Sequence, residues 1–307
     1  MKVAALDLGT NSFLCLIAEG DNKGLQYVHL DLMKIVRLGQ DLQKNGFIHP
    51  EALQRAKECL FEFKSVIDQH KVDRILALAT SAARDASNQN EFLEILNNLN
   101  IPTEIISGKR EAEVTYLGAT IDYRHEKEKT FLIIDVGGGS TEFIIGRNNQ
   151  ILFAQSIDIG GVRLTEKLIT HQPVSLIEKN NLSNYIDEQI KNILPHLRLH
   201  QIDQVLAVAG TPTSIAAIEV GGYDEQKVNN FPLSSSRLEF WMNEFANTSV
   251  EEKKQKYQLG GRADIIFAGA AILYRTLNAL ELAELTVSTR GVRFGIANEM
   301  FLDGHKK

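Results

Sequence analysis

A short motif occurs twice in this chain, and the repeat constrains the fold more than any other feature of the sequence. The first copy is ALDLGTNS at residues 5–12, and the second is IIDVGGGS at residues 133–140. Both place an Asp before a Gly and a Ser at the same spacing, and apolar residues flank both. Each copy therefore predicts a strand, a tight turn and a second strand. We expect two hairpins of one kind, one in each half of the chain.

The composition of the two turns indicates phosphate binding. Glycine lets the backbone approach an anion closely, so that successive N–H groups point at it, and hydroxyl groups add donors. The candidate donors are Thr10, Asn11, Ser12, Gly137, Gly138, Gly139 and Ser140. An Asp beside a phosphate needs a cation or a water between them, so two facing hairpins would clamp a phosphate chain, with Asp7 and Asp135 holding a divalent ion. Two unrelated hairpins with common turn residues are the alternative.

Length and charge narrow the class of protein. A chain of 307 residues favours two domains of ordinary size. The net charge of −6 argues against a broad nucleic-acid-binding surface. Cys15 and Cys59 have no CxxC spacing, which fits a reducing cytosol and argues against a disulfide scaffold or a cysteine metal site.

The sequence also predicts a cytoplasmic chain with no membrane partner. The N-terminus enters a strand at once, so we expect no signal peptide. The longest apolar-rich stretch, residues 265–273, is too short to span a bilayer. Its Gly-Ala-Ala at 269–271 would let it pack closely, so we expect a core helix there.

Strand and helix patterns alternate in both halves. The predicted helices are 50–70, 90–99, 111–121, 162–170, 176–193, 262–280 and 292–302. The predicted strands beyond the two hairpins are 74–79, 103–107, 205–209 and 285–288. The polar run 122–129 is expected to connect two domains. Alternation of this kind predicts an α/β fold with partly parallel sheets.

Two such hairpins and a later Gly-Thr turn resemble the actin-like ATPase superfamily. The chain resembles one branch of it, the exopolyphosphatase/guanosine-pentaphosphate phosphohydrolase family, in an ordered set of segments. These are ALDLGTNS (5–12), ATSAAR (79–84), IISGKREA (105–112), DVGGGSTE (135–142), GGVRLTE (160–166), GTPT (210–213), RAD (262–264) and GVRFG (291–295). The set covers nearly the whole chain.

The resemblance implies an α/β fold of two actin-like (ribonuclease H-like) domains around a central cleft. Domain I would comprise residues 1–122 and 292–307, and domain II residues 123–291. Longer family members carry a further C-terminal helical domain, so we expect the short two-domain form here.

The resemblance also implies a chemistry. We expect a Mg²⁺-dependent hydrolase that removes terminal phosphate from inorganic polyphosphate, from pppGpp or from both. Glu111 matches the catalytic glutamate of the family and would take a proton from water. Asp7, Asp135 and Glu142 are the candidates to hold Mg²⁺, which usually takes only one or two carboxylates. Arg84 would grip phosphate.

Several of these residues have plain structural alternatives. Glu111 suits the first turn of a helix for its dipole, and Glu142 suits an ordinary strand. Arg84 is placed to form a salt bridge with Asp85. The basic residues Lys109, Arg110 and Arg163 would extend a track for a polyanion or carry plain surface charge.

The pair His196 and His200 has a metal-ligand spacing, but no Glu lies between them and Pro195 precedes them, so we assign no metal there.

Two other functions stay open at this point. One is an ATP-dependent kinase of the same superfamily, and the other is a sensor that binds polyphosphate or alarmone without turnover. Phe294 stands where the family commonly has an acidic residue, and Pro212 removes a backbone donor from the Gly-Thr turn. These departures affect nucleoside contacts more than phosphate chemistry. Substrate preference and a homodimeric state are not specified by the sequence.

Overall fold

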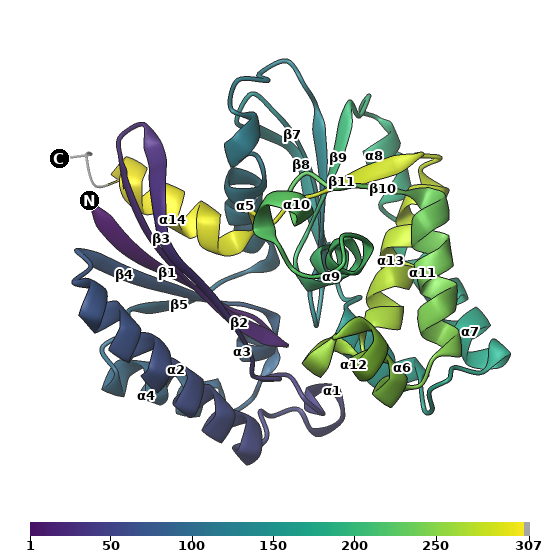
Figure 1. Ribbon diagram of the computed structural model, residues 1–307, viewed down its shortest axis with the longest axis horizontal. Helices are drawn as coiled ribbons and strands as arrows, with labels where there is room; N and C mark the ends of the chain where they lie inside the picture. The colour runs from purple at the N-terminus through teal and green to yellow at the C-terminus, as the bar shows by residue number, and fades with distance from the viewer. Residues whose placement is uncertain (304–307) are drawn as a thin grey trace. The chain divides into compact units, whose positions relative to one another are not determined.

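The computed structural model describes residues 1–303, which form two compact units (Figure 1). Unit 1 comprises Met1–Ile121 and a segment that starts at Arg290, and unit 2 comprises Asp122–Thr289. The last residues of the predicted domain I, 304–307, lie outside the described residues. Whether each unit is a domain that folds by itself stays a prediction.

Unit 1 is built on a five-stranded sheet with the order β3-β2-β1-β4-β5. Its strands are β1 (Lys2–Leu8), β2 (Ser12–Asp21), β3 (Gly24–Ile35), β4 (Arg74–Ala79) and β5 (Thr103–Ile105). β1, β2 and β3 pair antiparallel in sequence order, and β4 and β5 run parallel to β1.

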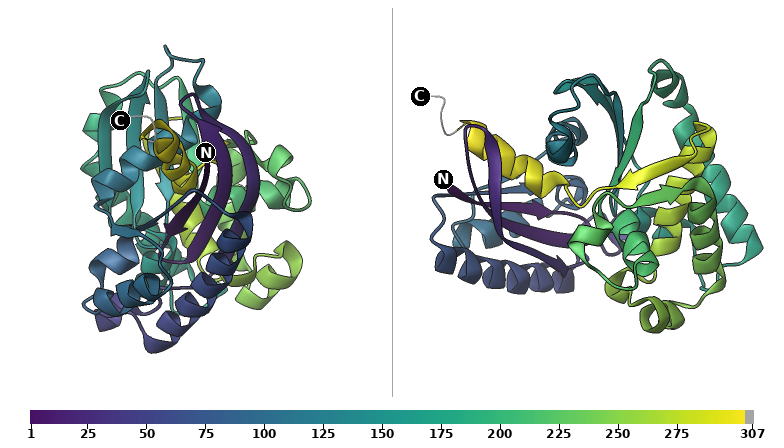
Figure 2. Two further views of the ribbon diagram at one scale, coloured as in Figure 1. Left: turned by 90° about the vertical axis from the view of Figure 1, so that its left-hand side faces the viewer. Right: turned by 45° about the horizontal axis from the view of Figure 1, so that its top comes forward.

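Helices cover both faces of the unit 1 sheet. They are α1 (Leu42–Asn45), α2 (Pro50–His70), α3 (Ser81–Asp85), α4 (Gln89–Asn98), α5 (Gly108–Ala119) and α14 (Val292–Asp303). Figure 2 shows α2 on one side of β1–β3 and α14 on the other. Side chains alternate along β1, so Leu6 and Leu8 join the core under α2, while Val3 and Ala5 join the core under α14 and α5. Asp7 shares the face of Val3 and Ala5 by the same alternation.

Unit 2 repeats this sheet and adds a strand. Its strands are β6 (Phe131–Val136), β7 (Thr141–Arg147), β8 (Gln150–Ile157), β9 (Gln204–Val208), β10 (Pro232–Ser234) and β11 (Glu284–Val287). The order is β10-β11-β9-β6-β7-β8. The run β8-β7-β6-β9-β11 therefore matches β3-β2-β1-β4-β5 in order and direction, and β10 is added antiparallel to β11. The α/β fold with two mixed sheets is confirmed.

The helices of unit 2 enclose its main core. They are α6 (Gly161–Leu168), α7 (Leu176–Lys191), α8 (Leu194–Arg198), α9 (Gly210–Glu219), α10 (Glu225–Val228), α11 (Ser235–Asn247), α12 (Val250–Tyr257) and α13 (Ile266–Ala279). The 3₁₀ turns are η1 (Ile121–Tyr123), at the unit boundary, and η2 (Gly260–Arg262). Helix α13 is buried from Ile266 to Leu273, and a Cβ on its Gly269 would lie 2.2 Å from Thr211 Oγ1. The predicted core helix is therefore confirmed.

Some predicted boundaries differ from the structure for local reasons. Helix α5 begins at Gly108 because the Ser107 side chain accepts the N–H of Arg110 and caps the helix, and β5 ends before that cap. Helix α13 begins later than predicted because the preceding residues form η2. Strand β3 carried no prediction; its alternation is irregular and few of its residues are fully buried.

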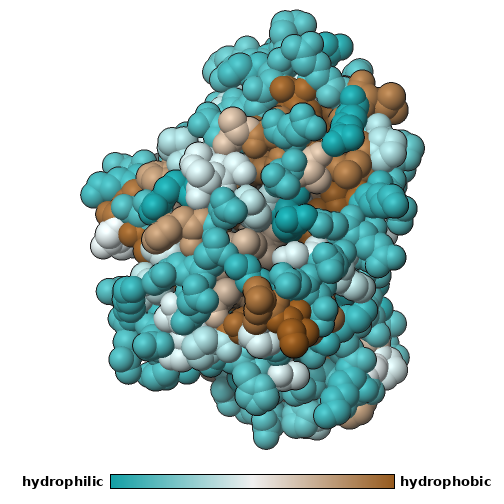
Figure 3. Space-filling model, turned by 90° about the vertical axis from the view of Figure 1, so that its right-hand side faces the viewer, coloured by the Kyte–Doolittle hydropathy of each residue, from teal (hydrophilic) through white to brown (hydrophobic). Residues whose placement is uncertain are grey.

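One side of the molecule is mainly hydrophilic, with small separate hydrophobic areas (Figure 3). The exposed apolar side chains of unit 2 include Leu176, Ile177 and Leu199. Isolated apolar side chains of this kind are usual on protein surfaces. Within residues 1–303, no helix combines the length and the apolar character that crossing a membrane requires.

Candidate functional site

The two repeated hairpins close with the same turn. The N–H of Gly9 donates to the carbonyl of Ser12 at 3.1 Å, and the N–H of Gly137 donates to the carbonyl of Ser140 at 3.0 Å. A Cβ on either glycine would stand 3.1 Å from that serine oxygen. The predicted strand–turn–strand units are confirmed, and the turns match in backbone detail.

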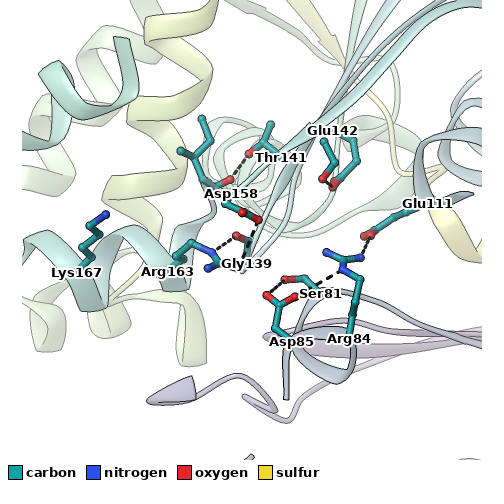
Figure 4. Close-up of polar contacts among 12 residues, drawn as sticks. Ser81, Arg84, Asp85, Glu111, Gly139, Thr141, Glu142, Asp158, Arg163 and Lys167 are labelled. Atoms are coloured by element: carbon teal, nitrogen blue, oxygen red, sulfur yellow. Dashed lines mark hydrogen bonds and ion pairs between the residues drawn. The ribbon is translucent and has the colours of Figure 1, made fainter. Parts of the chain in front are cut away.

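In unit 2 the carbonyl groups of the turn accept hydrogen bonds from residues of α6. Gly137 C=O accepts the N–H of Gly161, and Gly138 C=O accepts the N–H groups of Val162 and Arg163. These are N–H groups of the first helical turn, which have no partner inside the helix. The Arg163 Nε donates to Gly139 C=O at 2.6 Å (Figure 4).

This arrangement fixes the direction of the amide groups in the second turn. In a trans peptide the N–H points opposite to the preceding C=O. Since three successive carbonyls point toward α6, the N–H groups of Gly138, Gly139 and Ser140 point away from it. Among the described residues, the N–H groups of Gly138 and Gly139 donate no hydrogen bond. Three adjacent donors on one side of a turn form an anion-binding concavity.

The first turn in unit 1 is oriented in the same manner by a different segment. Thr10 C=O accepts the N–H of Gly39 at 2.9 Å, and Asn11 C=O accepts those of Val36 and Arg37 at 3.0 and 2.8 Å. By the same peptide geometry, the N–H groups of Asn11 and Ser12 point away from that segment.

Two side-chain atoms of this first turn are buried without a partner. Thr10 Oγ1 and Asn11 Oδ1 are buried and have no hydrogen-bond partner among the described residues. Unsatisfied buried polar atoms are costly, so they favour a polar ligand or ordered water at this turn.

A pair of buried carboxylates lies at the end of β6. Asp135 and Glu142 are direct partners in the β6–β7 ladder and are 6% and 1% exposed. Glu142 in turn is opposite Ser156 on β8, whose hydroxyl donates to Glu142 Oε1 at 2.7 Å. Like charges placed directly opposite each other destabilise a sheet. A cation shared by the two groups would remove that repulsion.

The donor set therefore fits Mg²⁺. This ion prefers oxygen ligands and usually takes one or two carboxylates with several waters, which the Asp135–Glu142 pair matches. No cluster of three or more His, Cys, Asp or Glu suited to a metal occurs within residues 1–303. Asp7 in unit 1 is opposite Leu14 and belongs to the face that α5 covers.

Glu111 lies in the first turn of α5 and is 7% exposed. Arg84 Nη1 lies 3.6 Å from Glu111 Oε2 and donates to Ile106 C=O at 3.1 Å (Figure 4). Arg84 Nε also lies 3.6 Å from Asp85 Oδ1. The structure thus brings Arg84 beside both the predicted base and the predicted salt-bridge partner. A buried carboxylate next to a guanidinium can hold a water or a proton at a fixed place.

The other basic candidates divide into three kinds. Lys109 is exposed. Arg110 forms a two-point ion pair with Glu299 on α14, and this hydrogen bonding raises the pKa of Arg110. Arg163 contacts the glycine turn itself. Arg110 and Arg163 are therefore each bound to a protein group within their own unit.

The Gly-Thr turn that starts at Gly210 is partly covered by protein. The Arg262 guanidinium covers Gly210, since a Cβ there would lie 2.7 Å from Arg262 Nε. Arg262 Nη1 also donates to Ser214 Oγ at 3.1 Å. Ala209, just before this turn, has φ 74° and ψ −166°, a conformation nearly restricted to glycine. Arg293 of the GVRFG segment forms a two-point ion pair with Asp31 at 2.7 Å.

Several residues near the turns carried no sequence prediction. Gly160 packs against the second turn, and a Cβ there would lie 2.5 Å from the backbone of Gly138. Gly39 packs in the same way against Thr10 of the first turn. The doubled glycine at 160–161 is a signal for the former, whereas Gly39 lies in a segment without a recognisable pattern.

The two cysteines and His196 have structural roles in packing. The thiols of Cys15 and Cys59 are free and belong to one core, where burial raises the pKa of each to about 12. The His196 ring stacks on Phe153 at 5.5 Å.

Comparison with known proteins agrees with this geometry. The model of the Ppx/GppA phosphatase family matches residues 16–303. The chain is 31% identical over 313 residues to Exopolyphosphatase 2 of Mycobacterium tuberculosis, covering 96% of this chain and 97% of that protein. It is also 31% identical to a bifunctional 3-dehydroquinate synthase/phosphatase of Fusobacterium nucleatum, covering 90% of this chain but only 43% of that longer protein.

A solved structure shows the same fold over the full length. The exopolyphosphatase from Cytophaga hutchinsonii superimposes with a TM-score of 0.88 at 28% identity, covering 100% of this chain and 99% of that one. The family match extends over most of the chain and begins at residue 16, within β2, so it contains the second hairpin but not β1 or the first turn. With its fold, its repeated turns and these similarities, the chain belongs to the Ppx/GppA phosphatase family.

Proposed function

We propose that this chain is a Mg²⁺-dependent phosphoanhydride hydrolase that removes terminal phosphate from inorganic polyphosphate, from pppGpp or from both. The observation that carries the proposal is the orientation of the two turns, whose carbonyls are bound by their own unit while their N–H groups point the other way. The names of the relatives of matching length favour polyphosphate as the first substrate to test.

The turns supply the binding of phosphate. In the second turn the N–H groups of Gly138, Gly139 and Ser140 donate to phosphate oxygens, and in the first turn those of Asn11 and Ser12 do so. The Thr10 hydroxyl adds a donor that lacks a partner among the described residues. Backbone donors recognise the phosphate group itself, which a polyphosphate end and a nucleoside polyphosphate share.

Asp135 and Glu142 are proposed to hold Mg²⁺, with Asp7 contributing directly or through water. When bound, the ion neutralises charge on the phosphate oxygens and on the leaving group. Ser156 donates a hydrogen bond to one oxygen of Glu142 and so orients the carboxylate.

Glu111 is proposed as the general base. Its carboxylate accepts a proton from a water whose oxygen forms a bond to the terminal phosphorus. The bridging P–O bond breaks, and the shortened chain leaves with the electron pair on its oxygen while orthophosphate is released. Arg84 lies 3.6 Å from Glu111, so its guanidinium can bind the terminal phosphate beside the base.

Phosphate release by the purified chain tests this proposal. Long-chain polyphosphate, pppGpp and ATP would be compared with Mg²⁺ present, using Glu111→Gln as the test variant. Glu113→Gln is the matched control, because Glu113 lies on the same helix, is more exposed, and pairs with Arg110 at 3.7 Å. We expect Glu111→Gln to lower kcat by about 10²- to 10⁴-fold, as for loss of a general base, and Glu113→Gln to keep wild-type turnover.

Three outcomes would overturn the proposal. Unchanged turnover in Glu111→Gln would remove Glu111 as the base. Tight binding of polyphosphate without any phosphate release would assign the chain to sensors. A strict requirement for an acceptor molecule would assign it to kinases.

A further inference from the structure

An arginine stands behind each of the two turns, on the side opposite to the amide donors. In unit 2 this is Arg163 on α6, whose side chain is 13% exposed. Its Nε donates to Gly139 C=O at 2.6 Å, and its Nη2 lies 3.7 Å from Asp158 Oδ1. Because Gly139 C=O and Ser140 N–H belong to one peptide plane, fixing the oxygen also fixes the direction of that N–H.

In unit 1 the arginine acts through one intervening segment, residues 36–40. Arg55 on α2 donates from Nε to Val36 C=O at 2.7 Å and from Nη2 to Arg37 C=O at 3.2 Å. Its Nη2 also donates to Gln40 Oε1 at 2.9 Å. The same segment donates its N–H groups to the carbonyls of Thr10 and Asn11.

Residues 36–40, which accept the hydrogen bonds of Arg55, are in a region of unfavourable backbone conformation that such bonds would stabilise. Arg37 has φ 54°, and Asp41, just after the segment, also has φ 54°. Left-handed conformations are unfavourable for residues other than glycine. A planar guanidinium with several fixed donors can join three acceptors at once, which a lysine cannot do in the same geometry.

We propose that Arg163 and Arg55 are positioning residues that aim the amide groups of the two turns, rather than groups that bind substrate. The proposal rests on the proposed function, in which those amides bind phosphate. Arg163 is the informative case, because sequence reasoning placed it in a substrate track. Its Nε donates to the carbonyl of Gly139, so we expect its loss to affect phosphate binding through the turn.

The first test is made on the free protein. Glycine amide signals would be recorded by NMR on the isotope-labelled chain without substrate, comparing wild type, Arg163→Ala and Arg55→Ala. We expect Arg163→Ala to shift the signals of Gly138 and Gly139, and Arg55→Ala to shift that of Gly39. A side chain that only touches substrate would leave these signals in place. Arg275→Ala is the matched control, since Arg275 forms a two-point ion pair with Asp187 elsewhere in unit 2.

The second test measures binding of inorganic tripolyphosphate by calorimetry, in the Glu111→Gln background so that turnover does not interfere. We expect Arg163→Ala and Arg55→Ala each to weaken binding by roughly tenfold to a hundredfold, the range for one charge-assisted hydrogen bond. Arg163→Lys should recover part of the loss, since an ammonium still donates once. Millimolar guanidinium should rescue Arg163→Ala in turnover assays, whereas a general loss of stability would become worse.

The two tests separate the inference from the function. If wild type neither binds nor hydrolyses polyphosphate, the proposed function fails, and the NMR comparison still decides whether the arginines hold the turns. If wild type is active but glycine signals and tripolyphosphate binding are unchanged in both variants, the positioning role is wrong. If Arg163→Ala does not fold, Arg163→Lys and Arg55→Ala carry the same comparison.

Discussion

The two hairpins have the same backbone pairing but differ in the residue that lies opposite their shared Asp. Leu14 is opposite Asp7 in the first hairpin, whereas Glu142 is opposite Asp135 in the second. The turns nevertheless close with the same glycine-to-serine hydrogen bond. An anion-binding turn made of backbone N–H groups tolerates changes of side chain, whereas a cation site made of carboxylates does not.

The next strand extends this difference. Leu14 is paired with Met33 on β3, and Glu142 is paired with Ser156 on β8. An apolar ladder in unit 1 therefore corresponds to a ladder of carboxylate and hydroxyl in unit 2. We therefore expect phosphate binding to be common to both hairpins and cation binding to belong mainly to the second.

The largest expected effect comes from making the second hairpin resemble the first. Glu142→Leu removes one of the two ligands of Mg²⁺ proposed in unit 2, so we expect kcat to fall by roughly 10²- to 10³-fold, together with weaker activation by Mg²⁺. The measurement is phosphate release across a Mg²⁺ titration. Folding should persist, because the substitution also removes the repulsion between opposed carboxylates.

The matched control is Leu14→Met in the first hairpin, at the equivalent ladder position. A volume-conserving apolar change there should leave both kcat and the Mg²⁺ response near wild type. If Glu142→Leu kept its Mg²⁺ response and Leu14→Met lost it, the assignment of the cation to the second hairpin would be reversed.

A smaller effect is expected from the glycines that back the turns. A Cβ at Gly160 would meet only backbone atoms of the second turn, at 2.5 to 2.7 Å, whereas a Cβ at Gly39 would meet chiefly the Thr10 methyl at 2.3 Å. A methyl at the end of a side chain can move away, but the turn backbone cannot. We expect Gly160→Ala to lower the unfolding free energy by about 3 kcal/mol and Gly39→Ala by about 1 kcal/mol.

Urea unfolding of both variants measures this difference, and turnover at saturating polyphosphate shows whether the turn has moved. Equal losses in the two variants would mean that the second turn is as compliant as the first. That result would contradict the inference that the second turn holds its three amide groups rigidly for phosphate binding.

Much of this comparison was predictable from sequence because the informative signals are local. The repeated Asp-Gly-Ser spacing predicts both hairpins, and the alternation of strands and helices predicts the α/β class. Helix α2, with its first-turn Pro50 and regular apolar face, follows its predicted bounds. The roles of the predicted site residues stay predictions.

The parts that sequence did not predict depend on contacts between distant segments. Arg55 reaches residues 36–40 from the next helix, and no local pattern marks it. The sequence alone allows Arg163 to be a substrate ligand, because it does not show the hydrogen bond from Arg163 Nε to Gly139 C=O. The pairing of Glu142 with Ser156 follows only from the register of β7 and β8, which includes an irregularity.

The two units also differ in how they accommodate a buried charge. In unit 1, Arg293 is neutralised by Asp31 through two hydrogen bonds of 2.7 Å. In unit 2, Lys253 is fully buried and donates to the neutral Gln172. Burial lowers the pKa of Lys253 from 10.5 to about 8, and the nearby Asp264 only partly opposes this.

The sign of the pH dependence follows from proton counting. Between about pH 8 and 10.5 the unfolded chain keeps the proton of Lys253 that the folded chain has lost, so this group makes stability rise with pH across that window. We expect a contribution on the order of 2 kcal/mol. One pKa unit corresponds to about 1.4 kcal/mol, and solvent screening reduces the full value of the shift. Lys253→Met should lose this rise and be more stable than wild type near neutral pH, as measured by urea unfolding at both ends of the window. The free energy of unfolding could instead change with pH equally in wild type and Lys253→Met. In that case the charge of Lys253 would be as well neutralised as that of Arg293, and the two units would not differ in this respect.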